Sequence, residues 1–286
     1  MSIEAVQTVA IATRAAPRRR FNGQLTVTLV ALGWVALVLV VAVVPALFAA
    51  GDPTALQPQR ALAAPGETPL GTDQFGRSLW LLIVHGARQS VIVGLAATAL
   101  AVALGCVLGL WGGYAGGLAD MIIGRVIDTL MCFPGVLLAL IIAAALGPSI
   151  PNLIIAVGVA AVPQFSRVMR GQVLSVRGRL FVEAARSLGF RQLRIILRHV
   201  LPNSLAPIVV LATISVGVAI VSAASLSFLG LGPRTDVPDW GQLLASGQPY
   251  LSSAWWISTF PGIAITLTVL SISLLGDWLR DRLDTD

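Results

Sequence analysis

The stretch EAARSLGFRQLRIILRHVLP, residues 183–202, is the longest polar interruption between the hydrophobic segments of this chain. It contains one acid, Glu183, and four arginines: Arg186, Arg191, Arg194 and Arg198. Helical spacing gathers apolar residues on one side of the stretch and arginines on the other. The apolar side consists of Val182, Ala185, Leu193, Ile196, Leu197 and Val200, and the basic side of Arg191, Arg194 and Arg198. The pattern predicts two short amphipathic helices between two hydrophobic spans.

Two residues mark the bounds of these short helices. Gly189 interrupts the pattern where the C-terminus of a helix favours glycine. Pro202 stands where the next span begins, a position at which a missing backbone N–H is tolerated. We therefore expect the segment to lie across one face of the membrane between two spans.

Composition places the whole chain in a membrane. Of its 286 residues 56% are hydrophobic and 11% charged, and the mean hydropathy is +0.87. Soluble domains carry about 25% charged residues. The sequence therefore predicts an all-α protein that crosses the membrane several times, with no second soluble domain. The two cysteines, Cys106 and Cys132, lie in apolar runs and suggest no disulfide framework.

Six segments have the roughly 20 apolar residues that a spanning helix needs. They cover residues 25–50, 90–111, 124–147, 150–166, 205–229 and 257–276. The fourth is short and is expected to end near Pro163. The first is too long for the apolar part of a signal peptide. This divides the chain into an N-terminal tail (1–24), a first span with an external segment (25–87), a core of five spans (88–280) and a C-terminal tail (281–286).

Arginine distribution orients the spans. With both termini in the cytoplasm, fifteen of the nineteen arginines are cytoplasmic, and only Arg60, Arg77, Arg88 and Arg234 lie outside. Basic loops are retained in the cytoplasm, so this orientation is favoured. The high pI, about 10.9, then reflects topology and does not indicate nucleic-acid binding.

Ionisable residues are almost absent from the spans. Asp128 is the clearest one in an apolar setting, and His85 and His199 lie in loops. A stand-alone secondary carrier would need acids, histidine or lysine at mid-depth and an internal repeat. A membrane-embedded enzyme would need a nucleophile and a base that converge. Neither requirement is met in the sequence.

Small residues recur every fourth position along the second span, at Ala101, Gly105, Gly109, Gly113 and Gly117. Such a stripe lets two helices approach closely. Packing within the chain is the simpler interpretation, and contact with another subunit is the alternative.

The amphipathic stretch itself has two interpretations from its residues alone. It could rest on anionic lipid, or it could dock a cytoplasmic partner. Glu183, Ala184 and Ala185, with Gly189 after three residues and then Leu201 and Pro202, resemble the EAA motif of permease subunits in bacterial binding-protein-dependent ABC importers. This resemblance favours docking.

Further segments resemble the C-type permease of the dipeptide and oligopeptide branch, in an ordered series over about residues 25–284. They are LGTDQFGRS (70–78), HGARQSVIVG (85–94), RVIDTLMCFPGVLLAL (125–140), RGQVLSVR (170–177), FVEAARSLG (181–189), RHVLPNSLAPIVV (198–210), LSFLGLG (226–232) and LGDWLRDRLD (275–284). The resemblance implies a type I ABC importer permease fold with a cytoplasmic coupling helix between the fourth and fifth spans.

The resemblance also implies a mechanism and a set of partners in the bacterial inner membrane. The segment around Glu183 would insert into a groove on an ATPase subunit and transmit its closure to the pore. The partners would be a related second permease, two ATP-binding subunits and a substrate-binding protein. This chain has no lysine and no phosphate-binding loop. ATP and Mg²⁺ would thus be bound by the partners, with no cofactor or metal in this chain.

The same branch implies a short peptide as substrate, and its members also carry nickel chelates, haem or glutathione. Two positions depart from the pattern: Ser78, where relatives commonly have aspartate, and Ala223, where they often have glutamate. If that glutamate faces the pore, this pathway is more apolar than usual. The segment 233–250, followed by Trp255 and Trp256, fits an external loop that either contacts the binding protein or simply re-enters the membrane.

Overall fold

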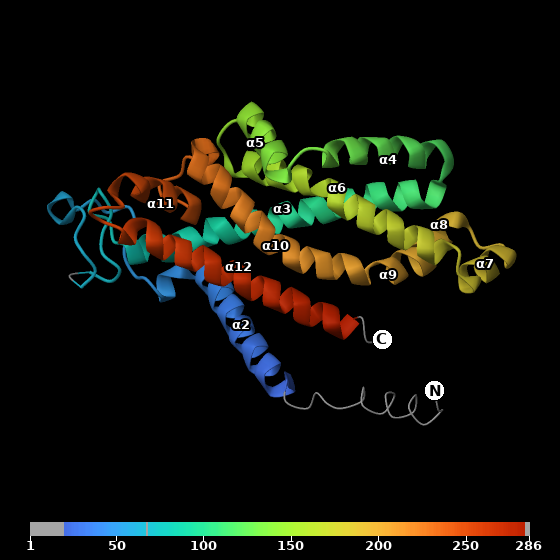
Figure 1. Ribbon diagram of the computed structural model, residues 1–286, viewed down its shortest axis with the longest axis horizontal. Helices are drawn as coiled ribbons and strands as arrows, with labels where there is room; N and C mark the ends of the chain where they lie inside the picture. Colours follow the sequence, from blue (N-terminus) through green and yellow to red (C-terminus); the bar gives the residue numbers. More distant parts are fainter. Residues whose placement is uncertain (1–19, 67, 284–286) are drawn as a thin grey trace, which may run out of the picture.

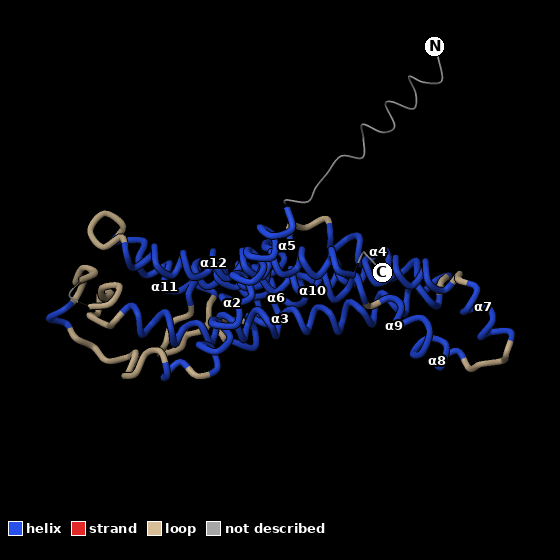
Figure 2. The backbone as a smooth tube through the Cα atoms, turned by 90° about the horizontal axis from the view of Figure 1, so that it is seen from below, coloured by secondary structure: helices blue, strands red, loops and turns tan. Residues whose placement is uncertain are grey.

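The computed structural model describes residues 20–66 and 68–283, which form an elongated bundle of helices (Figure 1). No strand occurs among these residues (Figure 2). The long helices are α2 (Arg20–Val43), α3 (Leu79–Ala115), α4 (Gly117–Met131), α5 (Gly135–Leu146), α6 (Ile150–Arg177), α10 (Ala206–Leu226) and α12 (Trp256–Leu283). The short elements are η1 (Pro45–Leu47), η2 (Pro58–Arg60), α7 (Leu180–Ser187), α8 (Gln192–Ile195), η3 (Ile196–Val200), α9 (Leu201–Ser204), η4 (Ser227–Leu231), α11 (Trp240–Gly247) and η5 (Gln248–Tyr250).

The prediction of a helical protein with several membrane spans is confirmed. Within the described residues, five helices are long and apolar enough to cross a membrane: α2, α3, α6, α10 with its extension, and α12. The helices α4 and α5 pass the same test only as a pair, which is bent by 92°, so the described residues contain five such spans, or six if this pair counts as one. Most of the N-terminal tail expected at 1–24, and the last three residues of the tail expected at 281–286, lie outside the described residues.

The third span is therefore not one straight helix over 124–147, as the hydropathy pattern predicts. Helix α4 ends at Met131 and α5 begins at Gly135, with Pro134 between them in an extended conformation (φ −55°, ψ 129°). Proline has no N–H to continue the helix, and it disfavours helical backbone at the residue before it. A hydropathy window registers apolar length but not this break.

The bounds of three other spans also differ from the expected ones. Helix α6 does not stop near Pro163 but passes through it to Arg177. Transmembrane helices tolerate an internal proline because neighbouring groups satisfy the freed backbone. Helix α3 has 37 residues, or about 55 Å at 1.5 Å per residue, and exceeds the roughly 30 Å hydrocarbon core. Helix α2 ends at Val43, before Pro45.

The central packing joins α3 to α6 through three of the predicted glycines. A Cβ on Gly105 would stand 2.5 Å from the Cβ of Phe165, and one on Gly109 would stand 2.8 Å from that of Met169. Gly113 lies in the same way against Arg170 and Val173 of α6. The stripe thus packs within the chain.

Gly117 does not belong to this contact. The helix α3 ends at Ala115, and the backbone reverses through Gly116 (φ +67°) before Gly117 (φ +56°) opens α4. Gly117 is exposed, with no atom near its ideal Cβ position. The expectation that it continues the stripe is wrong, because a four-residue repeat keeps one face only while the helix lasts.

The bundle has two distinct ends (Figure 1). Helices α7 and α8 project beyond the spans at one end, here called the α7 end. Helix α11 and the connection between α2 and α3 gather at the opposite end, here called the α11 end. The first described turn of α2 and the last turn of α12 both point towards the α7 end. This arrangement agrees with an even number of crossings.

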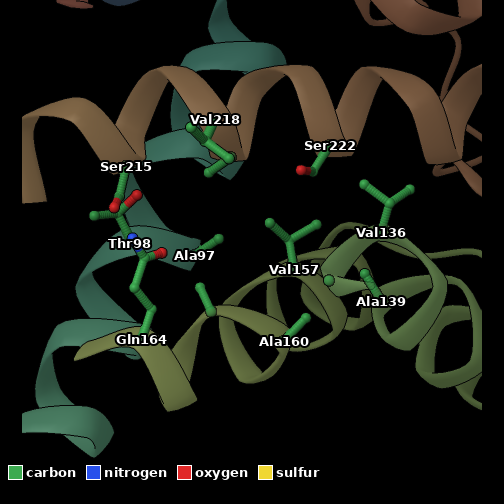
Figure 3. A pocket seen from close by; sticks show the side chains of 13 residues that line it. Ala97, Thr98, Val136, Ala139, Val157, Ala160, Gln164, Ser215, Val218 and Ser222 are labelled. Atoms are coloured by element: carbon green, nitrogen blue, oxygen red, sulfur yellow. The ribbon is translucent and has the colours of Figure 1, made fainter. Parts of the chain in front are cut away.

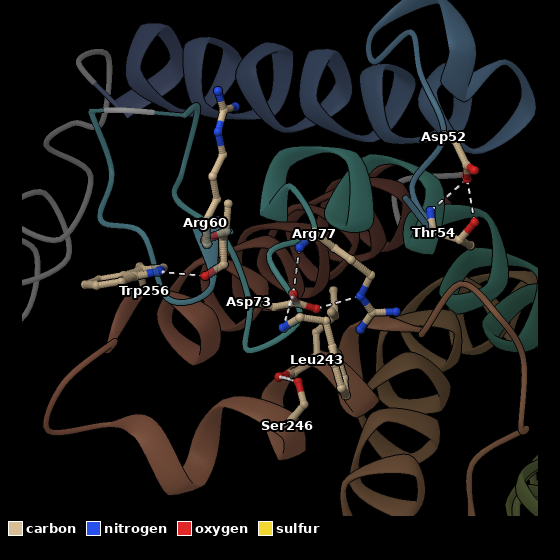
Figure 4. A network of polar contacts seen from close by, with 10 residues as sticks. Asp52, Thr54, Arg60, Asp73, Arg77, Leu243, Ser246 and Trp256 are labelled. Atoms are coloured by element: carbon tan, nitrogen blue, oxygen red, sulfur yellow. Dashed lines mark hydrogen bonds and ion pairs between the residues drawn. The ribbon is translucent and has the colours of Figure 1, made fainter. Parts of the chain in front are cut away.

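Polar contacts fix the loops of the α11 end (Figure 4). The buried carboxylate of Asp73 accepts hydrogen bonds from the backbone N–H groups of Phe75 and Arg77, both at 2.9 Å, and pairs with the Arg77 guanidinium at 2.7 Å. The indole N–H of Trp256 donates to the carbonyl of Thr72 at 3.1 Å. Trp256 is thus a buried structural contact, while its neighbour Trp255 is exposed.

Asp239 performs a similar role for α11. It is buried, and its carboxylate accepts the N–H groups of Gly241 (2.8 Å) and Gln242 (3.0 Å) and the hydroxyl of Ser227 (2.8 Å). This is an N-cap that satisfies two orphan donors of the helix. Burial raises the pKa of the Asp239 carboxyl above its usual value, although the bonds from Gln242 and Ser227 act in the opposite direction.

Candidate functional site

The segment between α6 and α10 presents a short helix on a fixed base. In α7, Val182 and Ala185 are buried against the hydrophobic cluster that includes Val173 and Val176 of α6. Glu183 and Ala184 are exposed on the other side of the same helix. The apolar residues at spacing three hold α7 in place, so that the acidic and small residues face away from the protein.

A glycine turn ends this helix. Gly189 has φ +77°, a left-handed conformation that costs other residues energy. Its N–H donates to the carbonyl of Arg186 at 2.9 Å, and the N–H of Phe190 donates to that of Ala185 at 3.2 Å. These two bonds form a Schellman motif, which satisfies the last carbonyls of a helix. Gly189 therefore lies where the sequence places a helix stop.

Contacts with α3 join the segment to a second long helix. The Arg186 guanidinium lies 5.9 Å from the centre of the Tyr114 ring, at the end of α3. The Tyr114 hydroxyl donates to the side-chain oxygen of Gln192 in α8. From the end of α6, Arg177 donates to the carbonyl of Gly113 at 2.7 Å. The segment thus contacts α3 through Arg186 and Gln192 and α6 through the buried Val182 and Ala185.

An aromatic contact closes the segment on itself. The His199 ring lies 6.4 Å from both the Phe181 and Phe190 rings, measured between centroids, and stacks on the latter at 11°. Phe181 belongs to α7 and His199 to η3, so the ring connects the helix before the glycine turn with the one after it.

The helical wheel is only partly right for this segment. Val182, Ala185 and Val200 are buried, but Leu193 is 66% exposed and Leu197 is 54% exposed, and Ile195 is buried in their place. A single wheel assumes one continuous helix. Here the turn at Gly189 interrupts the helix, so residues after it no longer follow the angular spacing of residues before it. The π-helical turn η3 changes that spacing a second time.

Leu201 and Pro202 lie at the junction with the next span. They open the short helix α9, where Leu201 is half-buried and Pro202 is exposed. The span α10 itself begins at Ala206, so the expectation that Pro202 starts it is wrong by four residues. Proline is accommodated here in the first turn of a helix, as predicted.

A cavity of about 280 Å³ lies in the middle of the bundle, between α3, α5, α6 and α10 (Figure 3). Its walls consist mainly of Ala, Val and Gly side chains. The polar side chains that line it are Thr98, Gln164, Ser215 and Ser222. Val136 and Val218 on its rim are exposed, so the cavity opens to the outside of this chain. The sequence analysis missed this site, although hydroxyls at 215 and 222 share one helical face.

Two ion pairs near the α7 end also escaped the sequence analysis. Asp128 in α4 pairs with Arg167 of α6 at 2.6 Å, and Asp120 pairs with Arg170, whose Nη2 lies 2.7 Å from Oδ2. The paired residues are 39 and 50 positions apart along the chain, so nothing local in the sequence indicates the pairing. Asp128 is therefore not an isolated charge in an apolar span.

Neither of the two departures from the resembled pattern lines the central cavity. Ser78 is the residue before α3, where its side chain makes no capping bond. Ala223 is buried within the cluster of α3, α5, α6 and α10 and lies near Asp239, next to but not in the cavity lining. A more apolar pathway at Ala223 stays a prediction, because the position borders the central cavity without lining it.

A family model described as "binding-protein-dependent transport system inner membrane component" matches residues 101–286. The chain belongs to this family. It is therefore a multi-pass membrane protein and the permease subunit of an ABC importer. The family is defined by transport that depends on a binding protein, so such a protein and an ATPase are its partners.

Named relatives cover most of this permease. The dipeptide transport system permease protein DppC of Alkalihalophilus pseudofirmus is 47% identical over 214 residues, which is 75% of this chain and 70% of the relative. The probable D,D-dipeptide transport system permease protein DdpC of Escherichia coli K12 is 37% identical over 96% of this chain and 95% of its own. The glutathione transport system permease protein GsiD of Pectobacterium atrosepticum is 41% identical over 75% of this chain and 71% of its own.

A solved structure shows the same fold. The inward-facing methionine ABC transporter MetNI, in its CY5 native crystal form, contains a chain that aligns with a TM-score of 0.57 at 17% identity. The alignment covers 71% of this permease and 96% of that chain. The type I ABC importer permease fold implied by the sequence is thereby confirmed.

Proposed function

We propose that this permease subunit passes short peptides across a bacterial inner membrane, and that the segment formed by α7 and the Gly189 turn couples it to ATP hydrolysis. The relatives named above are permeases for dipeptides, D,D-dipeptides and glutathione. Glutathione is itself a tripeptide, so all three names share a peptide substrate. Short peptides are thus the substrate class that the relatives support best.

The observation that carries the coupling role is the geometry of α7. This helix projects beyond the spans (Figure 1), with Glu183 and Ala184 exposed and Val182 and Ala185 anchored. Small residues permit close approach to a partner groove, and the Glu183 carboxylate can accept hydrogen bonds from partner donors. Arg186 connects α7 to Tyr114 of α3, and the buried Val182 and Ala185 connect it to α6. A movement imposed on α7 would thus reach the walls of the central cavity.

The proposed assembly contains a related second permease, two ATP-binding subunits and a substrate-binding protein. The rim of the central cavity is open and apolar at Val136 and Val218, which suits closure by a second permease. The sequence contains neither lysine nor a phosphate-binding loop. We therefore assign ATP and Mg²⁺ binding to the partner subunits and no catalytic, cofactor or metal site to this chain.

The proposed orientation places the α7 end in the cytoplasm, with both termini. Arginines concentrate there, because Arg177, Arg179, Arg186, Arg191, Arg194 and Arg198 all belong to or flank α7 and α8. The α11 end would face the binding protein on the outside.

A second function for the segment is favoured by its exposed leucines. Leu180, Leu188 and Leu193 are 83%, 73% and 66% exposed, beside several arginines. Such a surface could instead rest on anionic lipid. The two functions differ in their need for Glu183. Docking into an ATPase uses its carboxylate, whereas contact with anionic lipid does not.

Copurification from native membranes tests the proposed function. An affinity-tagged permease, extracted in mild detergent, should bring down a second permease and ATP-binding subunits, identified by mass spectrometry. The complex in proteoliposomes, with its binding protein, should take up labelled dialanine in an ATP-dependent manner. A tagged chain that is recovered alone, or a complete complex that takes up no peptide, would overturn the proposal.

A further inference from the structure

The central cavity lies at the middle depth of the spans. Thr98 is the twentieth of the 37 residues of α3, Gln164 the fifteenth of 28 in α6, and Ser215 the tenth of 21 in α10. Thr98, Gln164 and Ser215 converge at one end of the cavity, and Ser222 points into it from further along α10 (Figure 3). Hydrogen-bonding groups from three helices therefore meet where a bilayer would contain no water.

Three of these side chains have no hydrogen-bond partner within the described part of the chain: Gln164, Ser215 and Ser222. Of the three, Ser215 is buried at 8% exposure, Ser222 is half-buried, and Gln164 is exposed within this chain. A buried polar group without a partner costs free energy, and in hydrocarbon this cost cannot be recovered from solvent. Such groups are tolerated at this depth when they line a water-filled cavity or meet a ligand.

A second hollow in the same protein provides an internal comparison. It measures about 530 Å³, lies between α2, α3, α10 and α12, and is lined by aliphatic side chains and three threonines. All three threonine hydroxyls donate to the carbonyl four residues earlier, Thr98 to Gly94, Thr213 to Val209 and Thr268 to Ala264. In the apolar hollow each hydroxyl thus has a hydrogen-bond partner in the backbone of its own helix. Of these two hollows, the central cavity is the one whose lining includes unpaired polar side chains in the described part of the chain.

Charge is absent from the lining of the central cavity. None of its thirteen lining residues is Asp, Glu, Arg or His. The wall that this chain contributes therefore contains no counter-charge with which to select a substrate. It offers one amide, which donates and accepts, and hydroxyls, which do both as well. These groups match the alternating N–H and C=O groups of a peptide backbone.

We propose that Gln164, Ser215 and Ser222 form a binding subsite that hydrogen-bonds the backbone of a peptide in transit and does not distinguish peptides by the charge of their side chains. This inference rests on the proposed function, because it names how the peptide is recognised inside the permease. Selection among side chains then belongs to the binding protein. The subsite stabilises any short peptide at mid-depth, where its amides would otherwise lose their water.

Introducing a charge tests the neutrality of the subsite. Gln164→Glu changes one atom of the side chain and adds an anion to the wall. In proteoliposomes with the complete transporter and saturating binding protein, uptake of alanyl-lysine and alanyl-aspartate is measured relative to dialanine. The wild type should treat the two alike at this step, whereas Gln164→Glu should shift their ratio towards alanyl-lysine by about tenfold, since a charge in a partly desolvated site acts strongly. An unchanged ratio would overturn the inference.

Removing the hydroxyls tests the hydrogen bonds, with a control on the same helix. Ser222→Ala and Ser215→Ala should lower uptake of all three peptides by a similar factor. Ser225→Ala should not, because the Ser225 hydroxyl already donates to the carbonyl of Val221 at 2.8 Å and lies outside this cavity. Equal effects of the changes at 222 and 225 would contradict the subsite.

A labelling experiment keeps the inference testable if Gln164→Glu fails to assemble. In a Cys106→Ala, Cys132→Ala background, Ser222→Cys in the purified complex should react with a water-soluble thiol reagent, whereas Ser204→Cys should not, because Ser204 is fully buried. Thiol reactivity requires the thiolate, which forms only in contact with water. Equal labelling of the two cysteine variants would contradict the inference that the central cavity contains water. A wild-type complex that transports no peptide would overturn both the proposed function and this inference. An active Gln164→Glu complex with an unchanged ratio of alanyl-lysine to alanyl-aspartate uptake would overturn the subsite alone.

Discussion

The backbone N–H of Phe190 donates a hydrogen bond to the carbonyl of Ala185 across the left-handed turn at Gly189. This contact fixes where α7 stops and where the chain turns back towards α8. It therefore also fixes the direction in which Glu183 and Ala184 point. Nothing lies within 4 Å of the ideal Cβ position of Gly189, so the turn depends on backbone conformation alone and not on a tight contact.

Replacement of Gly189 should act through this backbone conformation. Gly189→Ala should cost about 1–2 kcal/mol in the turn, loosen α7 and reduce the amount of ATPase that copurifies with the permease. Gly189→Asn should retain more ATPase, because asparagine tolerates left-handed backbone better than alanine. Insertion into the membrane should be unchanged in both, as measured by the amount of permease in washed membranes. Equal ATPase recovery from the alanine and asparagine variants would contradict this role of the turn.

The contact of α3 with α6 should be sensitive to the size of residue 109. Gly109→Leu places side-chain atoms against Met169 and the backbone of Ser166 and Arg170. Overpacking of this kind costs about 1–3 kcal/mol, so the unfolding temperature of the detergent-purified protein should fall. Gly124→Ala is the matched control in α4, because nothing lies within 4 Å of its ideal Cβ. A normal unfolding temperature for Gly109→Leu would show that the two helices can separate freely.

The sequence predicts local features of this fold better than relations between helices. Apolar length identifies the crossings, and the four-residue spacing identifies Gly105, Gly109 and Gly113, because both signals belong to one helix. The break before Pro134 and the exposure of Leu193 escape such patterns. The break before Pro134 lies inside a continuous apolar run, and the exposure of Leu193 results from the interruption of the helix at Gly189.

The candidate sites divide in the same way. The exposed Glu183 and the stop at Gly189 are recognisable from a contiguous stretch of residues. The cavity is not, because Thr98, Gln164 and Ser215 are brought together only when α3, α6 and α10 are packed. The ion pair of Asp128 with Arg167 is a second example, since no spacing along the chain relates two residues on different helices.

The buried carboxyl of Asp239 should make stability depend on pH. Its pKa is raised in the folded protein relative to the usual 3.8. A raised pKa means that the stabilisation is complete below the unfolded value and is lost as the pH rises through the folded value. The wild type should therefore lose stability relative to Asp239→Asn as the pH rises from below 3.8. The test is the difference in unfolding temperature between the wild type and Asp239→Asn, measured at a series of pH values from below 3.8 upwards. A difference that does not vary with pH would contradict the raised pKa of Asp239.

The orientation of the permease can be tested by labelling intact cells. In a Cys106→Ala, Cys132→Ala background, a cysteine at Val237, near the α11 end, should react with a membrane-impermeant thiol reagent. One at Arg179, next to α7, should react only after the cells are opened. The opposite pattern would place α7 outside the cell and exclude contact with cytoplasmic ATPases.

The coupling role of α7 is the central claim, and substrate-stimulated ATP hydrolysis by the Glu183→Arg transporter tests it most directly. Glu183 is exposed in α7 and lies outside the spans, so the variant should insert and fold. If α7 docks into an ATPase, reversal of this charge should release the ATPase or abolish the stimulation of hydrolysis by loaded binding protein. If the segment instead rests on lipid, an added arginine should be neutral or strengthen membrane contact by about 1 kcal/mol. We predict loss of stimulation in Glu183→Arg, and wild-type ATPase recovery together with wild-type stimulation would contradict the account.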